Sequence, residues 1–424
     1  MQPQTAVEKI ISAHARGPVF AGELTTVSVD FVMAQDGNAP LAISLLRDEL
    51  GSDKTFDPEC VILVIDHCGP SPNEGASRMQ QLMRAFARDS GARLFDVGEG
   101  ISHVVLPEMG YARPGGLVVG SDSHSVTYGA LNCLGTGMGS TDIAVIMQQG
   151  RTWLRVPETT RVVLTGGLPP GVVAKDLALE MIKRIGVEGA TYDCLEVVGP
   201  GLAGLKMDAR LTLCNMAVEM GAKCALMPVD AVTEEYCAQH NIPLDSAVGS
   251  DEDAVYKRTV EIDLASIRQL IAPPHDLTRI VELVDFPNVK IDMAFIGTCT
   301  NSRLTDLEAA ADVLRGRRLA PGVRLVVTPG SRDVYLEAGR RGLIEVFVEA
   351  GGMVTPPGCG PCVGTHLGVP GDHEVVISTA NRNFKGRMGN SRAEIYLASP
   401  PVVAASAVAG YITTAPASDA APVA

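Results

Sequence analysis

Short apolar runs alternate with amphipathic helical patterns along most of this chain, and this alternation limits the folds that it can adopt. Residues 60–66 form an apolar run rich in β-branched side chains, which predicts a buried strand. Apolar residues at helical spacing follow over 76–89, and Gly91 supplies a stop. The same patterns predict strands at 117–120, 291–297, 323–328 and 374–379, and helices at 173–185 and 304–314. We therefore predict an α/β fold with parallel sheets covered by helices.

The length of the chain points to more than one domain. Its 424 residues exceed the roughly 250–300 residues at which a single core stops growing, so two or three domains are expected. Proline placement favours one break near Pro157 and another within 270–290. The last residues, 414–424, are rich in Ala, Pro and Ser, which predicts a flexible tail.

Charge and hydropathy exclude several classes of protein. The formal net charge is −14 and no basic patch is evident, which argues against nucleic-acid binding. No run approaches the roughly 18 apolar residues of a membrane span, so no membrane association is expected. The segment MQPQTAVEKI lacks the apolar core of a secretory signal. We therefore expect a cytoplasmic protein whose ten cysteines are reduced.

Polar clusters follow four of the predicted strands. They are Asp66-His67, Ser121–His124, Cys299–Asn301 and Asn381–Asn383. Ligands in open α/β sheets bind outside the carboxyl ends of the strands. Four clusters in this position therefore indicate one shared crevice that holds the functional site.

Three interpretations of the cysteines stay open from spacing alone. Cys359 and Cys362 form a C-x-x-C pair in a Gly/Pro loop, and Cys299 could join them to give three thiolates for an iron–sulfur cluster with one open iron. His366 could instead complete a zinc site, because its spacing from Cys362 suits one. The third interpretation is that the pair serves thiol–disulfide exchange, and the thiols are inert if none of the three applies.

Histidines and arginines in the clusters are candidates for proton transfer and anion binding. His67 and His124 each have an aspartate nearby, which can fix one tautomer of a proton-carrying imidazole, and His103 is a weaker candidate. Arg382 and Arg387 could grip substrate carboxylates, the alternative being a basic surface loop.

Two other features favour structural roles. The glycine-rich segment 135–140 lacks the lysine of a phosphate-binding loop, so we interpret it as a tight entry to a helix. His14 lies on a predicted amphipathic helix and is expected to be structural.

Six segments resemble the aconitase superfamily, above all its two-subunit branch, the large subunits of 3-isopropylmalate dehydratase and homoaconitase. The resemblance runs from about residue 5 to residue 412. The segments are DHCGPSPN (66–73), GSDSHSVTYGAL (120–131), CNMAVEMGA (214–222), IGTCTNSRLTDLEAA (296–310), GCGPCVGTHLGV (358–369) and STANRNFKGRMGN (378–390).

The resemblance implies one [4Fe–4S] cluster held by Cys299, Cys359 and Cys362. Its fourth iron, which has no protein ligand, binds the substrate hydroxyl and a carboxylate as a Lewis acid. His366 then becomes a structural neighbour and not a zinc ligand. The implied architecture is three α/β domains around the cluster, over residues 1–157, 158–286 and 287–413, without the fourth, swivelling domain of single-chain aconitases.

The resemblance also assigns roles to the remaining polar residues. His67, backed by Asp66, would protonate the departing hydroxyl, and Glu219 would lie beside the iron-bound water. The implied catalytic residues are Asp66, His67, His103, Asp122, His124 and Glu219, and the implied substrate contacts are Gln35, Ser123, Arg382 and Arg387.

In single-chain aconitases the swivelling domain supplies the serine base. Because this chain stops at Ala424, we expect a large subunit that is inactive without a small-subunit partner, in a heterodimer or higher assembly. The resemblance implies a hydro-lyase of leucine biosynthesis that interconverts 2- and 3-isopropylmalate. Homoaconitate and dimethylmalate or citramalate chemistry are alternatives. An RNA-binding apo-protein and a zinc hydrolase are remote ones.

Overall fold

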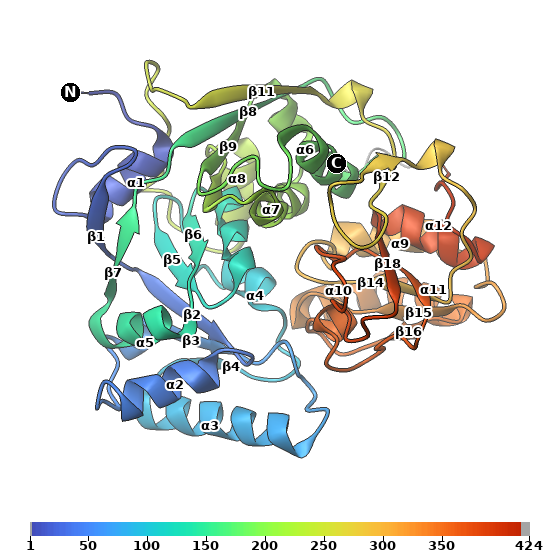
Figure 1. The fold of residues 1–424 in the computed structure, drawn as a ribbon, viewed down its shortest axis with the longest axis horizontal. Helices are drawn as coiled ribbons and strands as arrows, with labels where there is room; N and C mark the ends of the chain where they lie inside the picture. The colour runs from blue at the N-terminus through green and yellow to red at the C-terminus, as the bar shows by residue number, and fades with distance from the viewer. Residues whose placement is uncertain (1, 417–424) are drawn as a thin grey trace.

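A computed structural model describes residues 2–416, and the predicted tail lies outside the described residues from 417 onward. Three parallel β-sheets, each flanked by helices, make up most of the chain, as Figure 1 shows. The predicted α/β class with parallel-rich sheets is therefore confirmed. The predicted domain boundaries at residues 157 and 286 fall between sheets, and the division into three domains stays a prediction.

The first sheet has the strand order β4-β3-β2-β5-β6, and all its pairs are parallel. The strands are Arg93–Phe95, Val61–Val64, Phe31–Gln35, Leu117–Gly120 and Leu134–Gly137 in that order. Helices α2 (Ala39–Asp48), α3 (Glu74–Ser90) and α5 (Ser140–Gln149) pack together beside it (Figure 1). Helix α4 (Ser102–Glu108) faces the rest of the molecule. The apolar runs of the sequence became the buried strands because both faces of this sheet are covered.

Local signals set the ends of α3, the longest helix of the first sheet. The Asn73 side chain accepts the N–H of Ala76 at the start of the helix, which satisfies a free backbone donor. Gly91 ends it in the left-handed region, with φ of 82°, where a side chain would be strained.

The second and third sheets are also parallel throughout and are flanked by helices. The second has the order β10-β9-β8-β11 and the third β16-β15-β14-β17-β18, with all pairs parallel. The second sheet is built from Cys224–Leu226, Cys194–Val198, Thr159–Thr165 and Arg258–Asp263, with α6 (Ala174–Ile185), α7 (Met207–Met216) and α8 (Ala231–Gln239). The third is built from Met353–Val354, Arg324–Val327, Met293–Ile296, Val375–Ser378 and Glu394–Leu397, with α9 (Leu304–Leu314), α10 (Arg332–Arg340), α11 (Leu343–Ala350) and α12 (Pro400–Ala409).

Short elements join the sheets. Helix α1 (Ala6–His14) precedes the antiparallel pair β1 (Leu24–Ser28) and β7 (Arg151–Arg155), and a second antiparallel pair, β12 (Leu270–Ile271) and β13 (Val281–Glu282), precedes the third sheet. One hydrophobic cluster contains side chains from all three sheets, among them Met33, Val162 and Met293. The sheets therefore share a core. No helix within residues 2–416 has the length and apolar character needed to cross a membrane.

The 3₁₀ segment η2 (Ser123–Leu131) is the main contact between the first and second sheets. It packs against α7 and β10, and the Gly129 carbonyl accepts the N–H of Met227. A Cβ at Gly129 would lie 1.8 Å from the carbonyl oxygen of Ala225. The backbones can approach this closely only because Gly129 has no side chain.

We predict that Gly129→Ala lowers the free energy of unfolding by about 3 kcal/mol, because the two backbones must separate. Urea unfolding measures the loss. Gly204→Ala is the matched control, since nothing lies within 4 Å of its added Cβ. Equal stability of the two variants would contradict this account of the contact.

Candidate functional site

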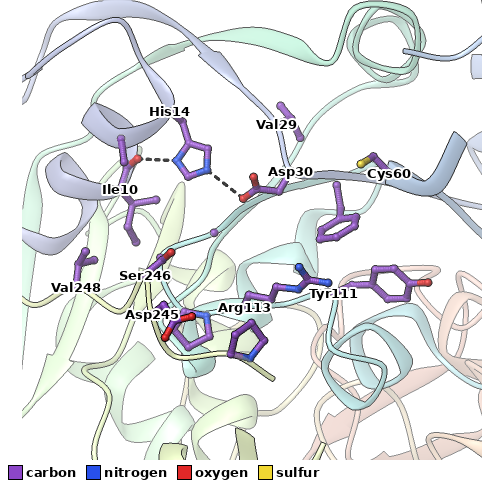
Figure 2. Close-up of a pocket in the computed structure, with 16 residues that line it drawn as sticks. Ile10, His14, Val29, Asp30, Cys60, Tyr111, Arg113, Asp245, Ser246 and Val248 are labelled. Atoms are coloured by element: carbon purple, nitrogen blue, oxygen red, sulfur yellow. Dashed lines mark hydrogen bonds and ion pairs between the residues drawn. The ribbon is translucent and has the colours of Figure 1, made fainter. Parts of the chain in front are cut away.

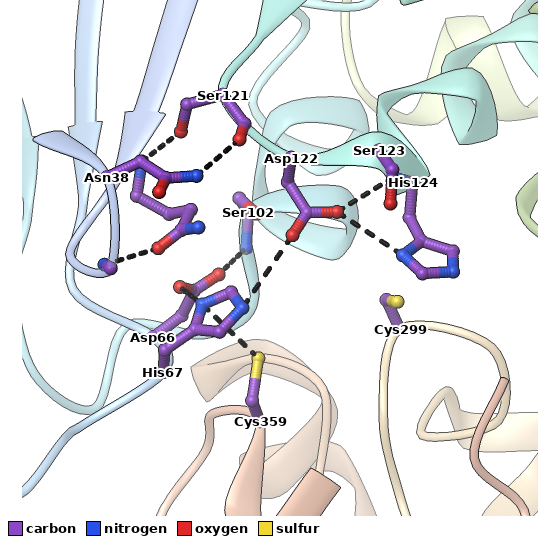
Figure 3. A network of polar contacts seen from close by, with 12 residues as sticks. Asn38, Asp66, His67, Ser102, Ser121, Asp122, Ser123, His124, Cys299 and Cys359 are labelled. Atoms are coloured by element: carbon purple, nitrogen blue, oxygen red, sulfur yellow. Dashed lines mark hydrogen bonds and ion pairs between the residues drawn. The ribbon is translucent and has the colours of Figure 1, made fainter. Parts of the chain in front are cut away.

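The polar clusters of the sequence meet where carboxyl ends of the first and third sheets face each other. Strands β2 and β5 end immediately before Asp36 and Ser121–His124, and Ile65 separates the end of β3 from Asp66-His67. Strands β14 and β17 lead into the loops that carry Cys299 and Asn381. Figure 3 shows His67, Asp122 and His124 from the first sheet opposite Cys299 and Cys359. The four strand-end clusters predicted to form one site therefore lie together.

Asp66 joins the two sheets and orients His67. One oxygen of its buried carboxylate lies 2.6 Å from Nδ1 of His67, and the other accepts the N–H of Ser102 at 2.8 Å. Its backbone carbonyl accepts the N–H of Cys359 at 2.8 Å. With Nδ1 held by Asp66, Nε2 of His67 faces the crevice, 3.7 Å from the carboxylate of Asp122. Such an arrangement fixes the ring and favours one tautomer.

Asp122 is shared by two further imidazoles. Its Oδ1 lies 3.1 Å from Nε2 of His103 and 3.3 Å from Nδ1 of His124, and it also accepts the N–H of His124. Burial alone would raise the pKa of Asp122, but the hydrogen bonds from both histidines hold that pKa well below its usual range. Asp122 is therefore a fixed negative charge in the crevice.

Glu219 extends this network into the second sheet. It lies in the 3₁₀ turn after α7, and its Oε1 is 2.9 Å from Nε2 of His124. Arg382 contacts the same carboxylate through Nε at 2.8 Å and donates through Nη2 to the Ser123 hydroxyl at 3.1 Å. Burial opposes ionisation of Glu219, yet His124 and Arg382 lower its pKa. Elements from all three sheets thus contribute to one network.

All three candidate cysteines are buried, and two of them, Cys299 and Cys362, contact the side chain of Asn381. Nδ2 of Asn381 lies 3.3 Å from Sγ of Cys299, and its Oδ1 lies 3.8 Å from Sγ of Cys362. Nη2 of Arg387 lies 3.3 Å from the Cys362 sulfur, and Sγ of Cys359 lies 3.9 Å from Nδ1 of His67. The loops after β14 and β16 carry the three sulfurs, and the loop after β17 carries Asn381 and Arg387, which contact two of them.

The donors around the sulfurs fit an anionic metal–sulfur group. Asn381 and Arg387 direct N–H groups at sulfur, and Nε of Arg387 is buried without a hydrogen-bond partner among the described residues. Burial raises the pKa of the Cys299 thiol to about 11, so metal binding would have to displace its proton. The residue before it, Thr298, has a φ of 72°, a strained value for a β-branched residue.

The zinc interpretation of the C-x-x-C pair receives less support. All ten cysteines are free thiols, a state that metal binding and thiol–disulfide exchange both allow. Both ring nitrogens of His366 are engaged locally, Nε2 with the Gly69 carbonyl and Nδ1 with the Thr365 hydroxyl. Among the described residues, one group of histidine, cysteine and carboxylate ligand atoms lies within 4.8 Å of one another. It consists of Asp66, His67 and Cys359, and His366 is not part of it. His366 is therefore a structural neighbour of the crevice.

The remaining predicted substrate contact is placed less clearly. Gln35 ends β2, is buried, and its Oε1 accepts the N–H of Gly37. Glycine-rich residues 135–140 form the end of β6 and the entry to α5, as predicted.

Sequence reasoning missed two residues that hold the site together. Asp36, 5% exposed, accepts the backbone N–H groups of Asp66, His67 and Cys68 at 3.3, 2.9 and 3.0 Å. Asp36 directly follows strand β2, so it could have been found by looking for polar residues at the carboxyl ends of predicted strands. Arg303 is also buried, and donates to the carbonyls of Cys299 and His103, which no local pattern reveals.

A cavity of about 670 Å³ lies elsewhere, at the amino ends of the first sheet (Figure 2). His14 and Asp30 in its wall are paired with each other at 3.0 Å. This pairing agrees with the structural role predicted for His14. None of the candidate site residues lines this cavity.

Comparison with known proteins defines the class. The model of the aconitase family (aconitate hydratase) matches residues 8–410. In fold, the chain is similar to aconitase X of Thermococcus kodakaraensis, with a TM-score of 0.50, 15% identity and 89% of each chain covered. The chain belongs to the aconitase family, so the resemblance inferred from six segments is confirmed. The family implies a [4Fe–4S] cluster.

Within the family, the chain is similar over nearly its whole length to subunits of two-subunit enzymes. It is 50% identical to 3-isopropylmalate dehydratase large subunit 1 of Thermotoga maritima, covering 97% of this chain and 98% of that protein. It is 48% identical to the homoaconitase large subunit of Thermus thermophilus, covering 97% of each.

Asp36→Ala should lower the free energy of unfolding by about 2–3 kcal/mol, because it leaves three backbone N–H groups without their acceptor. Urea unfolding of the apo-protein checks this. Asp53→Ala, which removes a carboxylate that is 77% exposed, should change little. If both variants have the same urea midpoint of unfolding as the wild type, Asp36 does not stabilise the turn at residues 66–68.

Asp122 should make stability depend on acid pH. Its pKa is lower in the folded chain than the roughly 3.9 of an unfolded aspartate. Its ionised form therefore stabilises the fold above about pH 4, and this contribution is lost as the pH falls through the lower folded pKa. The free energy of unfolding of the wild type should fall more steeply below about pH 4 than that of Asp122→Asn. Parallel pH profiles would contradict the assignment.

Proposed function

We propose that this chain is the large, cluster-bearing subunit of a 3-isopropylmalate dehydratase, a hydro-lyase that interconverts 2- and 3-isopropylmalate in leucine biosynthesis. The observation that carries the proposal is that loops with three buried thiols lie against Asp66-His67 and the Asp122–His124–Glu219 network. The full-length similarity to 3-isopropylmalate dehydratase large subunits supports the choice of substrate. Homoaconitate is the second candidate, because the similarity to a homoaconitase large subunit is almost as high.

Cys299, Cys359 and Cys362 would hold the [4Fe–4S] cluster, one per subunit. When bound, the cluster supplies a Lewis-acidic iron without a protein ligand, which polarises the substrate hydroxyl and a carboxylate. Asn381 and Arg387 contribute hydrogen bonds to two of the sulfurs. Such hydrogen bonds stabilise thiolate charge and tune the metal group.

His67 is the proposed proton donor to the departing hydroxyl. Asp66 accepts a hydrogen bond from the Nδ1–H of His67 and keeps the ring in place, so Nε2 is the atom that would exchange a proton in the crevice. The carboxylate itself is fixed by the Ser102 N–H and cannot turn away. His103 and His124, bridged by Asp122, would hold the opposite wall and orient the leaving water.

Arg382 is the residue proposed to bind a substrate carboxylate. Glu219 and Ser123 hold its Nε and Nη2, so the guanidinium has a fixed plane. Within the described residues its Nη1 makes no hydrogen bond, and its side chain is 26% exposed. A carboxylate arriving at that edge would meet a preoriented donor.

The base that removes the carbon-bound proton would come from a small-subunit partner. Relatives of the chain are named as large subunits, which supports a two-chain enzyme. A heterodimer or higher assembly, the cytoplasmic location and the absence of nucleic-acid binding stay predictions.

The test is anaerobic reconstitution of the chain with iron and sulfide, alone and with its small subunit. We expect about four iron and four sulfide per chain, and dehydration of 3-isopropylmalate by the pair but not by the chain alone. Assays on homoaconitate and on dimethylmalate or citramalate decide between the substrates. Cys359→Ser should prevent cluster assembly, whereas Cys60→Ser, a cysteine outside the site, should not.

Several outcomes would overturn the proposal. Full turnover by the chain alone would remove the need for a partner. A complete cluster in Cys359→Ser would contradict the ligand assignment. Activity on another acid at rates well above those on 3-isopropylmalate would move the enzyme to that substrate.

A further inference from the structure

Lys175 is a buried cation that the proposed chemistry does not use. It lies in the first turn of α6, in the second sheet's layer, and is 0% exposed. Its Nζ donates to two backbone carbonyls of the third sheet's loop after β17, to Thr379 at 2.9 Å and to Ala380 at 2.6 Å. The sulfur of Met216 is 3.9 Å away. Its hydrogen bonds are therefore to neutral groups.

The ammonium has no ion-pair partner. No carboxylate oxygen in residues 2–416 lies within 4.0 Å of Nζ. The neighbouring Asp176 is turned away, and its carboxylate accepts the N–H groups of Val173 and Leu270. Burial lowers the pKa of Lys175 to about 8, and the charge that most opposes this lowering is that of Cys299. A buried charge is strongly unfavourable unless negative charge lies near it, and the groups that act on Lys175 in this sense are Cys299 and, more weakly, Asp306, Glu219 and Cys362.

The loop that Lys175 contacts leads directly to the sulfurs. Ala380 precedes Asn381, whose side chain contacts the sulfurs of Cys299 and Cys362. Thr379 also accepts the hydroxyl of Thr300, the residue after Cys299. The cation therefore lies directly behind the loops that carry the sulfurs. A cluster held by three thiolates carries negative charge at this point.

We propose that Lys175 is the electrostatic counterion of the iron–sulfur cluster, a positioning residue that holds the Asn381 loop and stabilises the reduced, more negative form of the metal group. This inference rests on the proposed function, because it requires the cluster. A lysine that only clamped two carbonyls would fix the loop but would not set the cluster's reduction potential.

The experiment compares wild type with Lys175→Gln, Lys175→Met and Lys175→Arg after anaerobic cluster assembly. The readouts are the reduction midpoint, followed by EPR in a potentiometric titration, and the rate of iron loss to a chelator. Lys175→Gln removes the charge but keeps a donor, Lys175→Met removes both, and Lys175→Arg keeps the charge. Lys183→Gln, on the exposed face of the same helix, is the matched control.

We expect both neutral variants to shift the midpoint to lower potential and to lose iron several-fold faster. Lys175→Arg should lie nearer to wild type than Lys175→Gln, and Lys183→Gln should match wild type. Circular dichroism of the apo-proteins identifies the folded variants. If Lys175→Met does not fold, Lys175→Gln carries the comparison.

Wild-type midpoints and iron-loss rates in a folded neutral variant would overturn the proposal and leave Lys175 a backbone clamp. Failure of the wild type itself to assemble a cluster would overturn the proposed function together with this inference. The wild-type control therefore distinguishes the two failures.

Discussion

The site depends on Asp66, which ties the first sheet to the cysteine loop of the third. Its backbone carbonyl holds the N–H of Cys359, while its carboxylate holds His67 and the N–H of Ser102. The proposed proton donor and a proposed metal ligand are thereby fixed to the same residue. Distances between such groups decide rates, because reacting atoms must be held within a fraction of an ångström. Asp36 in turn holds the backbone of the 66–68 turn.

A second consequence of the fold is a continuous polar network across the crevice. From Tyr128 it runs through His103, Asp122, His124 and Glu219 to Arg382 and Ser123. Each carboxylate lies between cationic or potentially cationic partners, so both Asp122 and Glu219 stay ionised despite burial. In the proposed mechanism, a substrate carboxylate would bind Arg382 at the edge of the guanidinium that Glu219 and Ser123 leave unoccupied. The network explains why residues from three sheets are needed for one crevice.

Local patterns predicted much of this arrangement. The apolar run at 117–120 is strand β5, Gly91 ends α3, and all four strand-end clusters lie at the crevice. These succeeded because strand burial and helix ends depend on neighbours in the sequence. Arg303 and Lys175 were not predicted, because their partners lie far along the chain: Lys175 and Ala380 are 205 residues apart. The zinc interpretation had suitable spacing, yet both nitrogens of His366 are used within its own surroundings.

The same long separations bear on how the protein is made. Asp66 meets Cys359 across 293 positions, and the loop with Asn381 and Arg387, which contact two of the sulfurs, follows β17 near the end of the described chain. Contacts of this range form late, since the intervening chain must be ordered first. During synthesis the first sheet, whose last strand ends at Gly137, can fold before Cys299, Cys359 and Cys362 have been made. The proposed cluster can assemble only once all three cysteines are present and their loops have met, so these thiols would have to stay reduced until iron and sulfide are delivered.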